Sequence, residues 1–213
     1  MRLFNLVFGL FLFALGIVFA IQAHIGYAPW EVFHVGLSTT VGITIGTANI
    51  ITGVAIGIIA VLLGEKFGIG MIFNMFLIGI FIDLIMLPNI IPISGHLGVG
   101  LAMMLLGLVL ISVGSYFYIK SAFGAGPRDS LMLALNRRTK MPVGVCRGLL
   151  ELTATIGGWF LGGMVGVGTV FFVIMIGLCI QMIFKLFKFE AKSVQHETIC
   201  QTYQAVKRAF RKD

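Results

Sequence analysis

Long apolar runs, separated by short polar or glycine-rich stretches, dominate the pattern of this chain. About 20 predominantly apolar residues are enough for a helix to cross the hydrocarbon core of a bilayer. We expect a membrane-spanning helix in each of these ranges: 3–23, 44–63, 70–87, 97–119, 145–163 and 167–184. The pattern therefore predicts an all-α membrane protein with six transmembrane helices.

Composition strengthens this interpretation, since 59% of the residues are hydrophobic and only 11% are charged. The first apolar run follows Met1 and Arg2 and also resembles a secretory signal peptide. However, its residues 3–20 recur in the interior of the chain at 101–118, where no signal peptide can lie. We therefore expect the first run to be part of the mature structure.

The two halves of the chain match each other without gaps when the sequence is shifted by 98 positions. Residues 3–83 contain twelve glycines, and eight of them fall on another glycine, among them Gly9 on Gly107 and Gly26 on Gly124. Glycine makes up 28 of 213 residues, so chance would align fewer than two. The match predicts a duplication, with a first repeat at 3–87 and a second at 97–184.

Lysine and arginine are concentrated in every second loop. The loops after the first, third and fifth spans have none, whereas the alternate loops and the tail 185–213 carry most of the net charge of +7. Cytoplasmic loops are enriched in these residues, so both termini should be cytoplasmic. Each repeat has three spans, an odd number, and the two repeats should therefore be inverted, as in many transporters.

A short motif recurs between the first two spans of each repeat: Gly-x-x-Pro-x-acid, about a dozen amphipathic residues, then glycine. It reads GYAPWE at 26–31 and GAGPRD at 124–129. Proline suits the first helical position, and an acid in the first turn complements the free N–H groups and the helix dipole. We predict short helices at 29–40 and 127–138.

The acids of this motif, Glu31 and Asp129, are either helix caps or ligands for a cation or proton at a shared central site. The residues before them, Trp30 and Arg128, either contact an asymmetric solute or belong to the interfacial aromatic belt and the cytoplasmic basic residues. Both alternatives stay open at this point.

Arg147 and Glu151 are the ionisable pair within the fifth predicted span. They are four residues apart and share a helix face, so they can form an ion pair. Ionisable groups at membrane depth are costly and are often functional. The pair is either a gate or proton site, or a neutralised packing contact.

We find no catalytic motif, and we expect neither enzymatic activity nor a cofactor. Three widely spaced cysteines favour neither a disulfide framework nor a metal site.

On the motifs at 26–31 and 124–129, with Gly46, the turn 66–70 and Gly144, the chain resembles the YczE/YyaS/YitT type of small bacterial integral membrane proteins. The resemblance covers nearly all of residues 3–184. It implies a bacterial plasma-membrane protein and supports the architecture, but it does not identify a substrate.

We predict a small secondary transporter that binds a small-molecule solute near the midplane, with proton or cation coupling. The alternatives are the substrate-binding membrane subunit of a multi-component importer and a non-transporting membrane regulator. Expected partners are the lipid bilayer and, at the basic tail, anionic inner-leaflet lipids, but not nucleic acid. The sequence leaves open whether the protein is a monomer or a homodimer.

Overall fold

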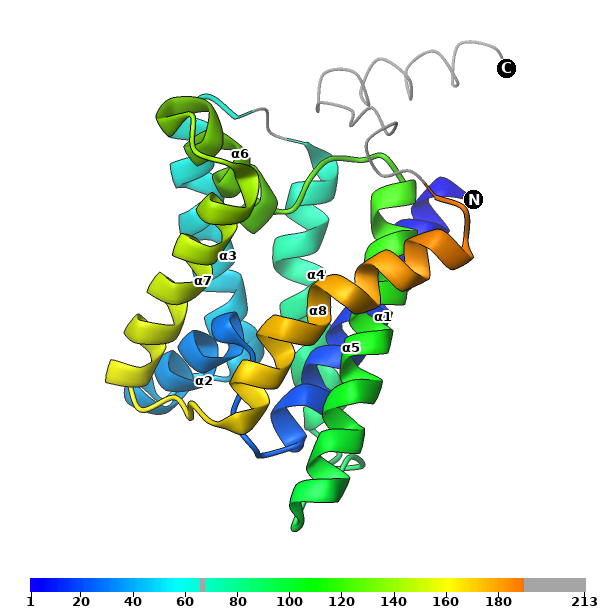
Figure 1. The fold of residues 1–213 in the computed structure, drawn as a ribbon, viewed down its shortest axis with the longest axis vertical. Helices are drawn as coiled ribbons and strands as arrows, with labels where there is room; N and C mark the ends of the chain where they lie inside the picture. Colours follow the sequence, from blue (N-terminus) through cyan, green and yellow to red (C-terminus); the bar gives the residue numbers. More distant parts are fainter. Residues whose placement is uncertain (66–67, 190–213) are drawn as a thin grey trace.

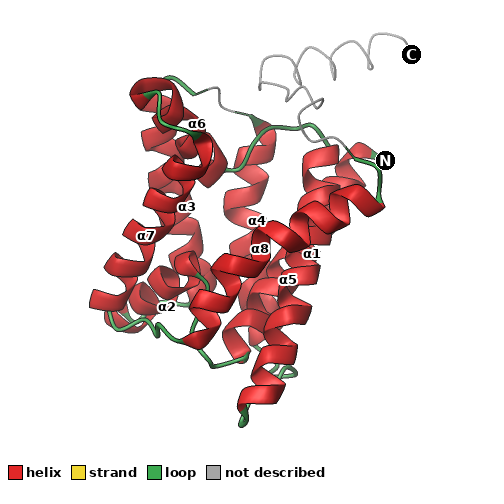
Figure 2. Cartoon of the chain, in the orientation of Figure 1, coloured by secondary structure: helices red, strands yellow, loops and turns green. Residues whose placement is uncertain are grey.

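The computed structural model describes residues 1–65 and 68–189, and these residues form eight α-helices and no strand (Figures 1 and 2). The predicted tail lies outside the described residues from position 190 on, as does Lys66 in the loop after the second predicted span. The helices are α1 (Arg2–Gln22), α2 (Pro29–Val41), α3 (Ile45–Leu62), α4 (Ile69–Met86), α5 (Leu97–Lys120), α6 (Pro127–Thr139), α7 (Val143–Phe160) and α8 (Val167–Leu186).

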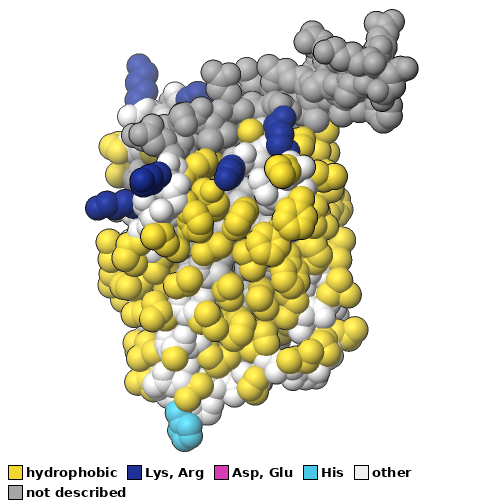
Figure 3. Space-filling model, turned by 90° about the vertical axis from the view of Figure 1, so that its right-hand side faces the viewer, with side chains coloured by type: hydrophobic (Ala, Val, Ile, Leu, Met, Phe, Trp, Pro, Cys, Tyr) yellow, Lys and Arg dark blue, Asp and Glu magenta, His cyan; other side chains and the backbone are white. Residues whose placement is uncertain are grey.

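The predicted class, an all-α membrane protein, is confirmed. Five helices, α1, α3, α4, α5 and α8, are long and apolar enough to cross a membrane. One face of the molecule shows a broad hydrophobic belt, with lysine and arginine side chains gathered at its upper end (Figure 3). α7 has 18 residues but carries Arg147 and Glu151, which make it more polar than the other five. Its place as a sixth span stays a prediction.

α1 and α5 pack along each other over most of their length (Figure 1). Glycines permit the close approach: an added Cβ at Gly16 would meet the Gly107 carbonyl oxygen at 2.6 Å, and one at Gly114 would meet that of Gly9 at 2.6 Å. Small residues at a crossing let helix backbones touch. The shift of 98 maps Gly9 onto Gly107 and Gly16 onto Gly114, so each crossing is the counterpart of the other.

Two backbone hydrogen bonds join the halves at their irregular loops. The Gly70 N–H donates to the Phe123 carbonyl at 2.7 Å, and the Gly168 N–H donates to the Ile25 carbonyl at 2.7 Å. The same shift of 98 converts the first bond into the second. The helices follow this exchange, since α2 packs against α7 and α6 packs against α3. Each half thus completes its packing with elements of the other.

The contact between α3 and α4 has no counterpart between α7 and α8. An added Cβ at Gly79 in α4 would meet the Gly46 carbonyl oxygen of α3 and, at 2.5 Å, Ile50 Cγ1. At the equivalent positions, Gly144 in α7 and Gly177 in α8, such a Cβ would have no atom of another helix within 4 Å. From the loop that joins them, α7 and α8 diverge toward the end of the molecule that bears α6 (Figure 1).

Asp83, near the end of α4, holds α3 and α4 together. Its carboxylate accepts hydrogen bonds from Thr44 Oγ1 at 2.6 Å and from the Gly46 N–H at 2.8 Å, both at the start of α3. Such charge-assisted bonds satisfy N–H groups that a helix leaves free at its N-terminus. The equivalents of Thr44 and Asp83 are Pro142 and Gln181, so α7 and α8 have neither the hydroxyl nor the carboxylate at these positions.

Candidate functional site

The two short helices, α2 and α6, begin at equivalent prolines and meet at their N-termini. The residues before Pro29 and Pro127 are extended and provide no side-chain cap, and the prolines supply the helical φ of the first turn. The Arg128 guanidinium lies over the Trp30 ring, 4.7 Å from its centroid. Since the shift of 98 maps Trp30 onto Arg128, this cation–π contact joins equivalent positions of the two halves.

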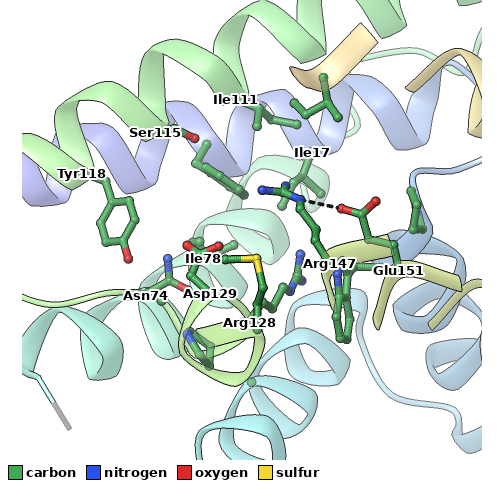
Figure 4. Close-up of a pocket in the computed structure, with 18 of the residues that line it drawn as sticks. Ile17, Asn74, Ile78, Ile111, Ser115, Tyr118, Arg128, Asp129, Arg147 and Glu151 are labelled. Atoms are coloured by element: carbon green, nitrogen blue, oxygen red, sulfur yellow. Dashed lines mark hydrogen bonds and ion pairs between the residues drawn. The ribbon is translucent and has the colours of Figure 1, made fainter. Parts of the chain in front are cut away.

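A cavity of about 310 Å³ lies at this meeting point, and each of the eight described helices contributes to its lining (Figure 4). Helices α1, α5 and α8 supply mainly apolar side chains, whereas α2, α6 and α7 supply the charged ones. All six candidate residues from the sequence line this one cavity: Trp30, Glu31, Arg128, Asp129, Arg147 and Glu151. The structure therefore brings them together; their role in binding stays a prediction.

Glu31 belongs to a buried polar cluster on the α2 side of the cavity. Its Oε1 lies 3.9 Å from Arg128 Nη1 and 4.0 Å from His34 Nδ1. His34, only 1% exposed, also lies 3.4 Å from Arg128 Nη2 and 3.4 Å from Asn49 Nδ2. The cluster gives the Glu31 carboxylate a cationic partner inside the protein.

Burial changes the titration of both acid and imidazole in this cluster. It raises the pKa of the Glu31 carboxyl above its ordinary value, while the Arg128 guanidinium acts in the opposite direction. Burial lowers the pKa of His34 well below its ordinary value, and Arg128 lowers it further. His34 is therefore neutral near pH 7, and Arg128 is the cationic group beside the Glu31 carboxyl.

Arg147 and Glu151 form the ion pair predicted from their spacing on α7, with Arg147 Nε 3.0 Å from Glu151 Oε1 (Figure 4). The arginine side chain is 48% exposed and the glutamate 19% exposed. This bond engages only the Arg147 Nε, and the other guanidinium N–H groups of this cavity-lining residue make no hydrogen bond with a described residue.

Two residues that the sequence did not single out as candidates also line the cavity, near the start of α6. Tyr118 of α5 and Asn74 of α4 face the first turn of α6, which carries Asp129 (Figure 4). Asn74 lies within the third predicted span, where a single polar residue usually makes an interhelical hydrogen bond, and Tyr118 lies at the end of the fourth, where tyrosine is usually interfacial. Their equivalents are Phe172 and Ala20, so the repeat offered no signal either.

Comparison with known proteins identifies one matching family and several bacterial relatives, one of which is described as a membrane protein. The family of unknown function DUF6198 matches residues 1–185. The uncharacterized membrane protein YczE of Bacillus subtilis is 36% identical over 177 residues, which cover 81% of this chain and 80% of YczE. An uncharacterized protein of Haemophilus influenzae is 29% identical over 176 residues, covering 83% and 80%, and YyaS of Bacillus subtilis is 30% identical over 178 residues, covering 82% and 88%.

No solved structure matches the chain. The resemblance to the YczE and YyaS type is confirmed by these relatives, and so is the assignment as a multi-pass membrane protein, which the apolar helices support independently.

Proposed function

The chain belongs to the family of unknown function DUF6198, and we propose that it is a small secondary transporter of a small-molecule solute. In this proposal two inverted repeats of three spans, with α7 as the sixth span, surround the central cavity. The protein lies in the bacterial plasma membrane with both termini in the cytoplasm. The contacts that interchange under the shift of 98, such as the two loop hydrogen bonds, support the inverted arrangement.

The observation that carries the proposal is the difference between equivalent helix pairs. Asp83 holds α3 and α4 together near the end that bears α2, whereas α7 and α8 are apart near the end that bears α6. The concentration of lysine and arginine at the α6 end supports a cytoplasmic location for that end. A cavity closed on one side of an inverted-repeat protein and open on the other is what alternating access requires of each end state.

The opposite state follows from exchanging the roles of the two halves. α7 and α8 would approach each other through Gly144 and Gly177, while α3 and α4 separate and release Asp83. Because Pro142 and Gln181 cannot reproduce the carboxylate contacts of Asp83, the closed cytoplasmic side has a weaker attachment. We infer that the cytoplasm-facing state is favoured without solute.

The cavity residues divide into two roles in this mechanism. Trp30, Arg128 and Arg147 contact the solute, because they present an aromatic face and hydrogen-bond donors. Glu31, Asp129 and Glu151 couple its movement to a proton or cation. Binding must change the relative stability of the two states, and groups contributed by both halves are suited to this, since their distances change when the halves move.

Disulfide trapping tests alternating access without knowledge of the solute. In a background without Cys146, Cys179 and Cys200, the pair Thr44→Cys/Asp83→Cys should crosslink in the present state. The pair Pro142→Cys/Gln181→Cys should crosslink in the opposite state. Free thiols are counted by alkylation with a maleimide polymer after mild oxidation in native membranes.

The control pair, Asp83→Cys/Pro142→Cys, joins opposite ends of the molecule and should not crosslink. If the second pair forms no more disulfide than this control, alternating access is rejected. Stable co-purification with an ATPase-bearing protein would then favour the importer subunit. Loss of cellular function on deletion of 186–213, but not on Glu31→Gln/Asp129→Asn, would favour the regulator.

A further inference from the structure

The charged groups of the cavity do not balance. Three carboxylates line it, from Glu31, Asp129 and Glu151, but only two guanidinium groups, from Arg128 and Arg147. Arg128 lies within ion-pair distance of Glu31, and Arg147 within that of Glu151. Asp129 makes neither an ion pair nor a hydrogen bond with any residue in the described part of the chain. Arg128 also interacts electrostatically with Asp129, but its ion-pair contact is with Glu31, so Asp129 is the carboxyl group without a direct partner.

Two other polar side chains line the cavity on the same side as Asp129. The Tyr118 side chain is buried, with 4% of the residue exposed, and its hydroxyl interacts with the Gly126 backbone but makes no hydrogen bond of ordinary geometry with a described residue. A buried hydroxyl without a partner is costly, so such a group in a native protein calls for a ligand or water. The Asn74 side chain likewise makes no described hydrogen bond and packs against the start of α6, within 3.3 Å of the Cβ position of Gly126.

These three side chains come from three helices and converge on one corner of the cavity (Figure 4). A carboxylate, an amide oxygen and a phenol oxygen are hard ligands, the kind that small cations and protonated amines prefer. A proton on Asp129 would neutralise the charge but would leave the amide and the phenol unused. A site with a single carboxylate suits a monovalent rather than a divalent cation.

We propose that Asp129, Asn74 and Tyr118 form a binding subsite for a monovalent cationic group. The group is either a free alkali-metal ion or the protonated amine of the transported solute, since both bind the same oxygen ligands. The inference rests on the proposed function, in which the cavity holds the solute. It separates the two equivalent acids: Glu31 has Arg128 as a direct cationic partner within the protein, whereas the direct partner of Asp129 is the bound cation.

The subsite is specific to the second half of the chain. Ala20 and Phe172 occupy the positions equivalent to Tyr118 and Asn74, so no hydroxyl or amide accompanies Glu31 from those positions. The bound cation therefore lies on the α6 side of the cavity, near the cytoplasmic end of the proposed transporter. This is the side on which α7 and α8 are apart in the structure.

The test measures the thermal unfolding of the purified full-length protein in different chloride salts at constant ionic strength. Tetramethylammonium, which has no N–H donor, is the reference, and sodium and methylammonium are the probes. Either probe should raise the unfolding midpoint of wild type with a saturating concentration dependence, because a ligand that binds only the folded state stabilises it. Stabilisation by sodium alone identifies a metal ion, and by methylammonium alone a solute amine.

Variants establish where the cation binds. Asp129→Asn should abolish the stabilisation, and Tyr118→Phe should weaken the apparent affinity roughly two- to tenfold, the usual effect of one hydrogen bond. Tyr116→Phe and Glu65→Gln are matched controls, because both side chains have partners outside the cavity, Lys120 and Arg137. Both controls should respond to the cation as wild type does.

Two outcomes overturn the subsite: neither probe stabilises wild type, or the effect persists undiminished in Tyr118→Phe and Asp129→Asn. Tyr118→Phe keeps the test decisive if Asp129→Asn does not fold. The disulfide experiment is independent of this one. If both disulfide pairs form but no probe stabilises the protein, the transporter proposal stands and the cation subsite is rejected.

Discussion

Two equivalent glycines, Gly79 in α4 and Gly177 in α8, should respond differently to the same substitution. Gly79→Ala places a methyl group against the Gly46 carbonyl oxygen and 2.5 Å from Ile50 Cγ1. Gly177→Ala places it where no atom of another helix lies within 4 Å. The two positions are related by the shift of 98 and both lie inside helices, so each is the other's control.

The loss of stability expected for Gly79→Ala follows from the close packing of α3 against α4. Restoring an ordinary contact of 3.4 Å to Ile50 Cγ1 requires a movement of about 1 Å. The contact with the Gly46 carbonyl is to backbone and cannot be relieved by a rotamer change. Overpacking costs about 1–3 kcal/mol. Lengthened hydrogen bonds from Thr44 and Gly46 to Asp83 bring the expected loss to about 2–4 kcal/mol.

The assay is thermal unfolding of both variants in the same detergent. A loss of stability of this size corresponds to a fall of about 5–15 °C in the unfolding midpoint for a protein of this length. Gly177→Ala should leave the midpoint unchanged or raise it slightly, because alanine favours a helix by up to about 1 kcal/mol over glycine. In the disulfide experiment, however, Gly177→Ala should reduce crosslinking of Pro142→Cys/Gln181→Cys by tenfold or more, since it obstructs the opposite state.

Equal destabilisation by both substitutions would refute the reasoning, because it would mean that α7 and α8 already touch. A neutral Gly79→Ala would equally contradict the close α3–α4 contact. An unchanged disulfide yield in Gly177→Ala would show that the opposite state does not bring Gly144 and Gly177 together.

Three further predictions concern single features. The pKa of buried His34 is lowered, so its contribution to stability is present above the ordinary histidine value of about 6.5 and is lost as the pH falls below it. His34→Met should therefore reduce the pH dependence of the unfolding midpoint between about pH 5 and 7. A pH profile equal to that of wild type would contradict this. Glu151→Gln breaks a partly exposed ion pair, so the midpoint should fall by less than that of a 1 kcal/mol change, whereas stabilisation by any solute found in a metabolite screen should be lost; a solute response equal to wild type would exclude Glu151 from the site. Gly26→Ala combines a φ of +109° with a contact 2.5 Å from the Gly166 nitrogen, and it should reduce the stability by more than about 2 kcal/mol. Gly42→Ala, at φ +77° with open space around it, should reduce the stability by about 1 kcal/mol. Equal unfolding midpoints for the two variants would show that the loop packing at Gly26 contributes nothing.

Local chemistry accounts for what could be predicted from the sequence. The apolar runs predicted membrane helices because a bilayer accepts only backbone that satisfies its own hydrogen bonds. Arg147 and Glu151 could be paired from their spacing because i and i+4 share a helix face, and the structure contains that ion pair. Repeat matching also singled out Trp30 and Arg128 as equivalent positions, and these two side chains stack.

Long-range packing accounts for what the sequence could not predict. Tyr118 and Asn74 meet Asp129 only because α4, α5 and α6 converge, and no spacing within one helix encodes that convergence. His34 has as its closest partners groups from α2, α3 and α6, so its position on α2 alone could not identify the cluster around Glu31.

By itself, the sequence determined the membrane class, the helical segments and the correspondence between the halves, because each depends on short-range hydropathy or on direct comparison of residues. Only the tertiary structure decided which equivalent contacts are made. Gly46 and Gly79 touch while Gly144 and Gly177 do not, although both pairs have the same residues at the same spacing. The physical reason is that two halves around one cavity need not close together, and the carboxylate of Asp83 stabilises closure on one side only.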